Sequence, residues 1–259
     1  MKLLYSSENE LRSGWKVARV FVIVIVLAAL FAILAALLKI EVLGDYAVHL
    51  AMILGALFGF RLDHKSVSFI GIRPNEKAFW KDSIIGFVWG GLLISFVVGG
   101  MVFITKEMSL SQFWEGTTVQ GLAYALIFWL VVAIGEESLF RGYIFSTLRP
   151  HMRLWVALII SACIFSAIHI INTDYYWFAY VYAILIGIAF GGIVIKRGNL
   201  GGAIGFHFAW NLLQDKIIFN TPARGGEVIY AVILVIMVIL IFWVLPMKPI
   251  INEQNEKTQ

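Results

Sequence analysis

The sequence predicts an all-α membrane protein, a bundle of about eight transmembrane helices with both termini on the cytoplasmic side. Of its 259 residues, 61% are hydrophobic and only 14% are charged. The hydrophobic residues form runs too long for a soluble core, which indicates helices that cross a lipid bilayer. The net charge of +4 comes from lysines and arginines between these runs, so it does not indicate nucleic-acid binding. A single cysteine excludes an intramolecular disulfide.

Eight apolar runs follow one another along the chain. The clearest is Val20–Leu38, which has no polar side chain and is long enough to cross the hydrocarbon core. The other predicted spans are Tyr46–Phe60, Ser83–Thr105, Val119–Leu148, Leu154–Ile171, Tyr175–Ile195, Leu200–Leu213 and Val228–Leu245. Spaced glycines are expected where two helices pack closely. The pairs are Gly86/Gly90, Gly187/Gly191, Gly198/Gly202 and Gly201/Gly205.

The placement of positive charge predicts the orientation of these spans. With the N-terminus inside, most lysines and arginines fall in inner segments, and the outer ones are Lys39, Lys106, Lys216 and Arg224. This asymmetry supports both the eight spans and an N-in, C-in topology. We expect one membrane domain in three parts: residues 1–118 with about three spans, 119–213 with the polar motifs described next, and 214–259 with the last span and a cytoplasmic tail.

Three short polar motifs lie inside the apolar runs. They are Glu136-Glu137-x-x-x-Arg141, Phe165-x-x-x-His169 and His207-x-x-x-Asn211. A charged side chain at the centre of a membrane helix costs roughly 2.5–3.5 kcal/mol, so such residues are expected to face the protein interior and to mark a functional site. At about 1.5 Å per helical residue from the nearest inner arginine, the three motifs lie within roughly 10 Å of one another in depth. They can therefore converge on one buried cavity.

The residue types indicate hydrolysis. Glu137 precedes Arg141 by four residues, which favours an ion pair and leaves Glu136 without a local partner and suited to act as a general base. His169 and His207 can point at one centre, and the amide of Asn211 can donate to a developing oxyanion. These groups can activate water and stabilise a tetrahedral intermediate. Glu136, His169 and His207 equally match the ligands of a divalent metal such as zinc.

Less specific interpretations compete with a hydrolytic site. A structural salt bridge explains Glu137 and Arg141, but it explains neither the second glutamate nor the buried histidines. We interpret His49, in the second span, as a packing or hydrogen-bonding residue, and Phe165 as a core residue that places His169. The sequence contains no H-E-x-x-H, G-x-S-x-G or phosphate-binding glycine loop, which argues against a zincin, a serine hydrolase of that type and a nucleotide cofactor.

Taken together and in this order, the three motifs resemble those of the CPBP family of intramembrane proteases (CAAX proteases and bacteriocin-processing enzymes, also called the Abi family). The resemblance covers about Val119–Leu213. It implies an all-helical membrane protease with a conical cavity open to one side. The family is often described as metalloproteases, and the resemblance leaves open whether a metal or the glutamate alone activates water.

The resemblance also implies a role for each motif residue. Glu136 would polarise the attacking water with the help of His169. His207 and Asn211 would bind the oxyanion, and Glu137 and Arg141 would form a supporting ion pair.

The predicted function is therefore an intramembrane endopeptidase that cuts a small hydrophobic peptide or a membrane-protein terminus in the bilayer of a bacterial cell membrane. One alternative is a non-proteolytic immunity or scaffold protein that binds a bacteriocin or a membrane partner through the same cavity. Another is a proton-coupled transporter, which favours an inverted repeat that this sequence lacks. A Glu136→Gln variant separates the first two, because only the protease needs this carboxylate.

Overall fold

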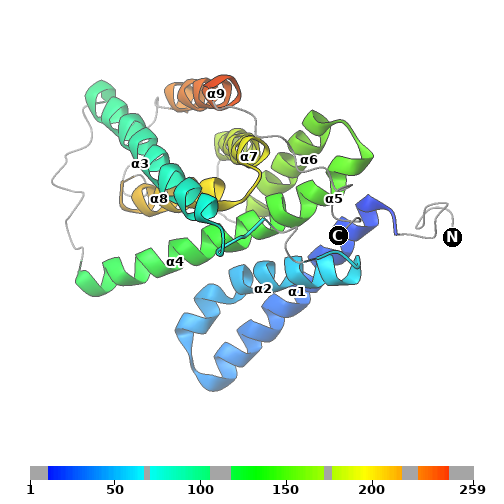
Figure 1. Cartoon of the computed structure of the whole chain (residues 1–259). Coiled ribbons are helices and arrows are strands. Elements are labelled where there is room, and N and C mark those ends of the chain that lie inside the picture. The colour runs from blue at the N-terminus through cyan, green and yellow to red at the C-terminus, as the bar shows by residue number, and fades with distance from the viewer. Residues whose placement is uncertain (1–10, 67–70, 106–117, 172–176, 218–226, 245–259) are drawn as a thin grey trace.

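The computed structural model describes residues 11–66, 71–105, 118–171, 177–217 and 227–244, and it confirms an all-helical bundle (Figure 1). The first half holds α1 (Ser13–Leu38), α2 (Glu41–Leu62), α3 (Lys77–Thr105) and α4 (Val119–Glu137). The π-helix η3 (Ser138–Phe145), α5 (Ser146–Leu148) and the 3₁₀ turn η4 (Arg149–His151) continue α4. The second half holds α6 (Leu154–Ala167), the 3₁₀ turn η5 (Ile168–Ile171), α7 (Trp177–Arg197), α8 (Gly201–Ile217) and α9 (Glu227–Val244). Each of the eight predicted apolar runs thus contains a helix.

Within the described residues, five helices are long and apolar enough to cross a membrane. These are α1, α2, α3 as far as Val97, α4 with its continuation to His151, and α7. Two shorter apolar helices, Leu154–Ile170 and Tyr230–Trp243, lie within α6–η5 and α9. The outward faces carry large apolar side chains, for example Leu37 at 75% exposure and Trp243 at 83%. Such faces suit lipid rather than water, so the chain is an integral membrane protein.

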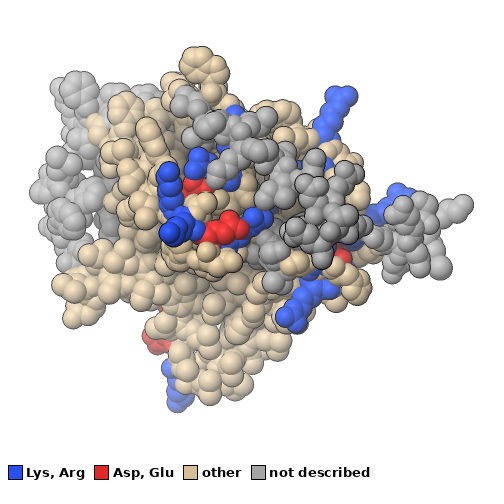
Figure 2. All heavy atoms as spheres, viewed as in Figure 1, with Lys and Arg blue, Asp and Glu red and all other residues tan. Residues whose placement is uncertain are grey.

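Charged side chains are few on the face shown in Figure 2, and one group of them lies near the N-terminal end of α3. Two ion pairs lie in this region. Arg73 pairs with Glu76 just before α3, and Arg197 at the end of α7 pairs with Asp82 of α3. Asp82 is almost fully buried and also accepts a hydrogen bond from the Asn199 amide at 2.7 Å. The side-chain oxygen of Asn199 in turn accepts from the backbone N–H of Gly201 at 2.9 Å. These bonds fix the start of α8 against α3 and the end of α7.

Helices α3 and α8 pack almost backbone to backbone, as the glycine spacing predicts. A Cβ added at Gly90 would lie 2.6 Å from the carbonyl oxygen of Phe206, and one at Gly205 would lie 3.0 Å from the backbone nitrogen of Phe87. A side chain at either glycine would force the two helices apart. This close contact sets the position of α8, the helix that carries the third motif.

Two other glycine predictions have different outcomes. Gly187 of α7 packs on Ala162 of α6, where an added Cβ would lie 3.0 Å from the alanine Cβ. Gly198 is not a packing glycine. Gly198 lies between α7 and α8 and has a backbone φ of 73°. A Cβ added there would meet nothing within 4 Å. The prediction of a Gly198/Gly202 packing pair is therefore wrong, because Gly198 serves the left-handed turn instead.

Candidate active site

The first motif spans a change of helix type. Glu136 and Glu137 form the end of α4 and are buried, and the chain continues without a break as the π-helix η3. Such π-turns inside α-helices are frequent at functional sites. The hydroxyl of Ser161 in α6 donates to the carbonyl of Phe140 at 2.9 Å, so this turn has a hydrogen-bond partner outside its own helix. Sequence periodicity did not predict the π-helix.

The π-helix is also anchored to the first two helices. Tyr143 is fully buried, and its hydroxyl donates to Asp63 at 2.8 Å. Arg19 of α1 binds the same carboxylate at 2.7 Å. Gly59 of α2 lies beneath the Tyr143 ring, because an added Cβ would lie 2.6 Å from the ring edge. The motif therefore rests on α1 and α2 as well as on α6.

Arg141 is buried, and both of its terminal nitrogens donate hydrogen bonds. Its Nη1 donates to Glu137 Oε1 at 2.8 Å, which is the predicted ion pair, and its Nη2 donates to the carbonyl of Gly187 at 3.1 Å. The guanidinium lies 4.4 Å from the ring centroid of Phe165 and 5.3 Å from that of Phe190. A charge removed from water persists only with such partners. Arg141 thus gives the Glu137 carboxylate a buried cationic partner.

His207 connects the two glutamates. Its Nδ1 lies 2.9 Å from Glu137 Oε1, and its Nε2 lies 3.5 Å from Glu136 Oε2. Because the Glu137 carboxylate is an acceptor, His207 Nδ1 carries a hydrogen and donates a hydrogen bond to it. The hydrogen bond fixes the ring, and Nε2 is left to face Glu136.

Glu136 has an imidazole beside each of its oxygens. Oε2 faces His207 of α8, and Oε1 lies 3.8 Å from Nε2 of His49 in α2. His169 also interacts electrostatically with this carboxylate. The glutamate that has no partner within its own helix therefore finds partners on other helices.

His169 is half-buried in the 3₁₀ turn η5, and Phe165 sets its orientation. The Nδ1 of His169 lies 2.8 Å from the Phe165 carbonyl, so it donates there and leaves Nε2 as an acceptor in the neutral ring. The Phe165 ring contacts His169 and His207 edge-on, with centroids 5.1 and 6.3 Å away. The same ring lies under Arg141. Phe165 is a buried residue that places His169, as predicted, and it also packs on the other two motifs.

Asn211 lies one helical turn after His207 and is half-buried. Among the residues that the structure describes, its amide has no hydrogen-bond partner. A free amide next to the histidine suits a group that donates to a substrate.

His49, which the sequence indicates as a packing or hydrogen-bonding residue, lies beside the site. It packs edge-on against Phe128, with ring centroids 5.9 Å apart, and it also faces Glu136. The depth of His49 in the membrane, taken from its distance to an inner arginine, indicates this placement in the sequence. His49 precedes the inner Arg61 by twelve residues, or roughly 18 Å of helix, which is close to the depth of Glu136.

The predicted metal ligands do not come together as a metal site. Across the described part of the chain, no three His, Cys, Asp or Glu side chains are placed to hold one ion. His169 and His207 each use Nδ1 in a protein hydrogen bond, to Phe165 and Glu137, which is also how a histidine that binds a metal through Nε2 is held. A metal ion at Glu136, His169 and His207 therefore stays a prediction of the sequence.

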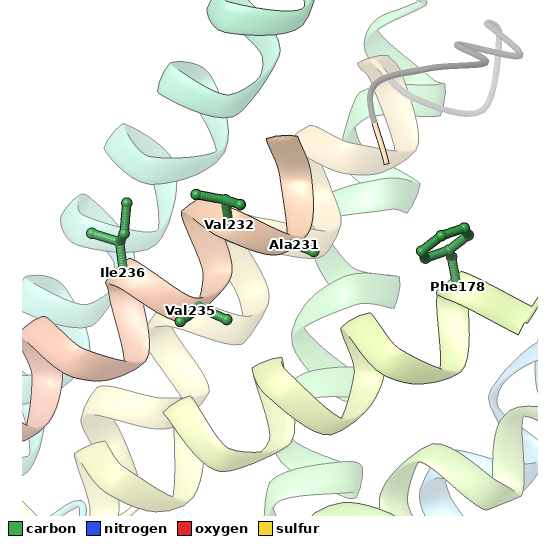
Figure 3. A pocket seen from close by; sticks show the side chains of 5 residues that line it. All are labelled: Phe178, Ala231, Val232, Val235 and Ile236. Atoms are coloured by element: carbon green, nitrogen blue, oxygen red, sulfur yellow. The ribbon is translucent and has the colours of Figure 1, made fainter. Parts of the chain in front are cut away.

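A shallow apolar groove lies elsewhere, between α7 and α9 (Figure 3). Its volume is about 340 Å³, and it is lined by Phe178, Ala231, Val232, Val235 and Ile236. No residue of the three motifs lines it, so this groove is separate from the site around Glu136.

Comparison with known families agrees with this site. Residues 118–213 match the family described as type II CAAX prenyl endopeptidase Rce1-like. No curated protein and no solved structure matches the chain significantly. The matched segment begins just before α4, ends within α8 and contains all three motifs. It confirms the family resemblance predicted from these motifs and supports a CAAX-type intramembrane endopeptidase.

Proposed function

We propose that this protein hydrolyses peptide bonds within the bilayer, with Glu136 as the group that activates water. The observation that carries this proposal is the contact of Glu136 with His207, which Glu137 and Arg141 hold in place. A membrane bundle that needed only an ion pair would not require a second buried carboxylate. The alternative of a purely structural network leaves Glu136 and the free amide of Asn211 unexplained.

The reaction begins when Glu136 takes a proton from water while the water oxygen attacks the carbonyl carbon of the peptide bond. A positioned general base of this kind contributes about 10²–10⁴-fold to the rate. His169 helps to orient the water, as the resemblance implies. The carbonyl oxygen becomes an oxyanion, and the intermediate is tetrahedral.

His207 and Asn211 stabilise this oxyanion. His207 Nε2 donates when the ring carries both protons, while Nδ1 stays hydrogen-bonded to the Glu137 carboxylate. As Glu136 gains its proton, it loses negative charge and releases its hold on the His207 Nε2–H. That N–H then donates to the oxyanion, together with the Asn211 amide, while the ring stays held by Glu137. The intermediate collapses when the C–N bond breaks and Glu136 returns the proton to the leaving amine.

The surroundings of the site favour an apolar substrate. The outer faces of the bundle meet lipid, and α4, the helix that carries Glu136, exposes the apolar side chains of Leu122 and Ile127. A small hydrophobic peptide or a membrane-protein terminus can reach the site from the bilayer, as the family's prenylated CAAX substrates suggest. We also propose a bacterial cell membrane as the location, as expected from the sequence.

The experiment compares peptide termini in membranes of cells that lack the protein and are complemented with wild type, Glu136→Gln or Glu76→Gln. Glu76 lies in an exposed ion pair outside the site, so this variant is the matched control. Fragments present with wild type and Glu76→Gln but missing with Glu136→Gln support the protease and name its substrate. Identical profiles in all three, with the phenotype rescued by each, would favour the immunity or scaffold protein. An ion-dependent flux in vesicles that contain the protein would favour the transporter.

A further inference from the structure

The second helix contributes a histidine to the site, although it lies outside all three motifs. Helices α2 and α4 cross where Gly135 meets His49. A Cβ added at Gly135 would lie 2.7 Å from the carbonyl oxygen of His49 and 3.2 Å from its Cα. The glycine directly before Glu136 therefore lets the backbone of His49 approach, and the imidazole comes to lie beside the carboxylate.

In the described part of the chain, Glu136 is the one polar group that the His49 ring contacts. Nε2 lies 3.8 Å from Glu136 Oε1, and Nδ1 is buried without a hydrogen-bond partner. The remaining contact is apolar, against the ring of Phe128. A buried N–H donor without an acceptor is costlier than a buried lone pair without a donor. The neutral ring therefore carries its proton on Nε2, where Glu136 can accept it.

The two histidines divide the two oxygens of Glu136 between them. His207 of α8 faces Oε2 and His49 of α2 faces Oε1, at 3.5 and 3.8 Å. A carboxylate held at one oxygen only can rotate about its last bond, whereas contacts at both oxygens fix its plane. Each carboxylate oxygen accepts at two positions, so a position remains for the attacking water. Catalytic hydrogen bonds are often long before substrate binds and shorten afterwards.

We propose that His49 is a positioning residue, which orients Glu136 by donating from Nε2 to Oε1. This inference rests on the proposed function, because it assigns a role in the same reaction. His49 does not touch the substrate in this account. It acts through Glu136, and its loss lowers turnover without weakening substrate binding.

The test uses the full chain in proteoliposomes with an internally quenched peptide built on the terminus that the wild type releases in membranes. The variants are His49→Leu, which keeps an apolar side chain but has no donor, and His49→Gln, whose amide can donate to Oε1. Val48→Ala is the control, since Val48 neighbours His49 on α2 and is exposed. Thermal unfolding in detergent shows whether each variant is folded.

We expect His49→Leu to lower kcat by about 10- to 100-fold with KM within about twofold, as for a misplaced catalytic group. His49→Gln should recover most of this loss, and Val48→Ala should match the wild type. If His49→Leu cuts at the wild-type rate, or if Gln and Leu are equally slow, the assignment of His49 is wrong while Glu136-dependent cleavage still supports the proposed function. A wild type that cuts no peptide contradicts the proposed function, and the role of His49 falls with it.

Discussion

The Nδ1 atom of His207 lies 2.9 Å from Oε1 of Glu137, and this contact joins the first and third motifs inside the bundle. Glu137 accepts from Arg141 through the same oxygen. One carboxylate thus fixes both an arginine and a histidine from separate helices. In the proposed mechanism Glu136 is left to face the substrate, so the two adjacent glutamates have separate roles.

Replacing Glu137 by Gln should destabilise the protein and stop turnover. The change leaves the buried Arg141 without its anionic partner, and breaking such a pair costs about 3–5 kcal/mol. Thermal unfolding in detergent, together with cleavage of the quenched peptide, measures both effects. Glu76→Gln is the control, since an exposed pair contributes about 0–1 kcal/mol. Equal unfolding temperatures for the two variants would contradict the central place of Glu137.

Two neighbouring glycines of α3 should differ in their tolerance of alanine. Gly90→Ala places a Cβ 2.6 Å from the Phe206 carbonyl oxygen and pushes α8 away, at a cost of about 1–3 kcal/mol. Displacing His207 by about 1 Å should lower kcat by up to about 100-fold. Gly91→Ala meets only a Leu213 methyl at 3.7 Å and should behave as wild type. The measurement is kcat and unfolding temperature for both variants; similar losses in both would refute the close contact.

Phe165→Leu should weaken the site while the bundle stays folded. The ring lies 4.4 Å from the Arg141 guanidinium, and such a contact contributes about 0.5–2 kcal/mol. Without the ring, His169 and His207 lose a common packing surface, so we expect kcat to fall about tenfold. Ile159→Val, on the lipid-exposed face of α6, is the control. Wild-type turnover in Phe165→Leu would mean that the backbone of residue 165 alone places His169.

Removal of divalent metals should leave peptide cleavage unchanged, because the described residues bring no three suitable ligands to one point. The test is the cleavage rate after incubation with EDTA and with 1,10-phenanthroline, together with elemental analysis of the purified protein. Loss of activity that zinc restores would show that Glu136, His169 and His207 rearrange around an ion.

The sequence predicted the eight helices and the convergence of three motifs, because a polar residue in an apolar run must face the protein interior. It could not predict the π-helix, since the same residues fit an α-helical pattern and the Ser161 bond to Phe140 depends on packing. Gly198 was misplaced because a turn glycine and a packing glycine look alike in sequence. His49 was undervalued, because its partner lies on another helix and no motif links them.

The most direct test of the account is cleavage of the quenched peptide by purified wild type and Glu136→Gln in proteoliposomes of the same composition. We predict that Glu136→Gln folds with a similar unfolding temperature but lowers kcat by about 10²–10⁴-fold, the contribution of a general base. A Glu136→Gln variant that cuts the peptide at the wild-type rate would contradict glutamate-activated hydrolysis.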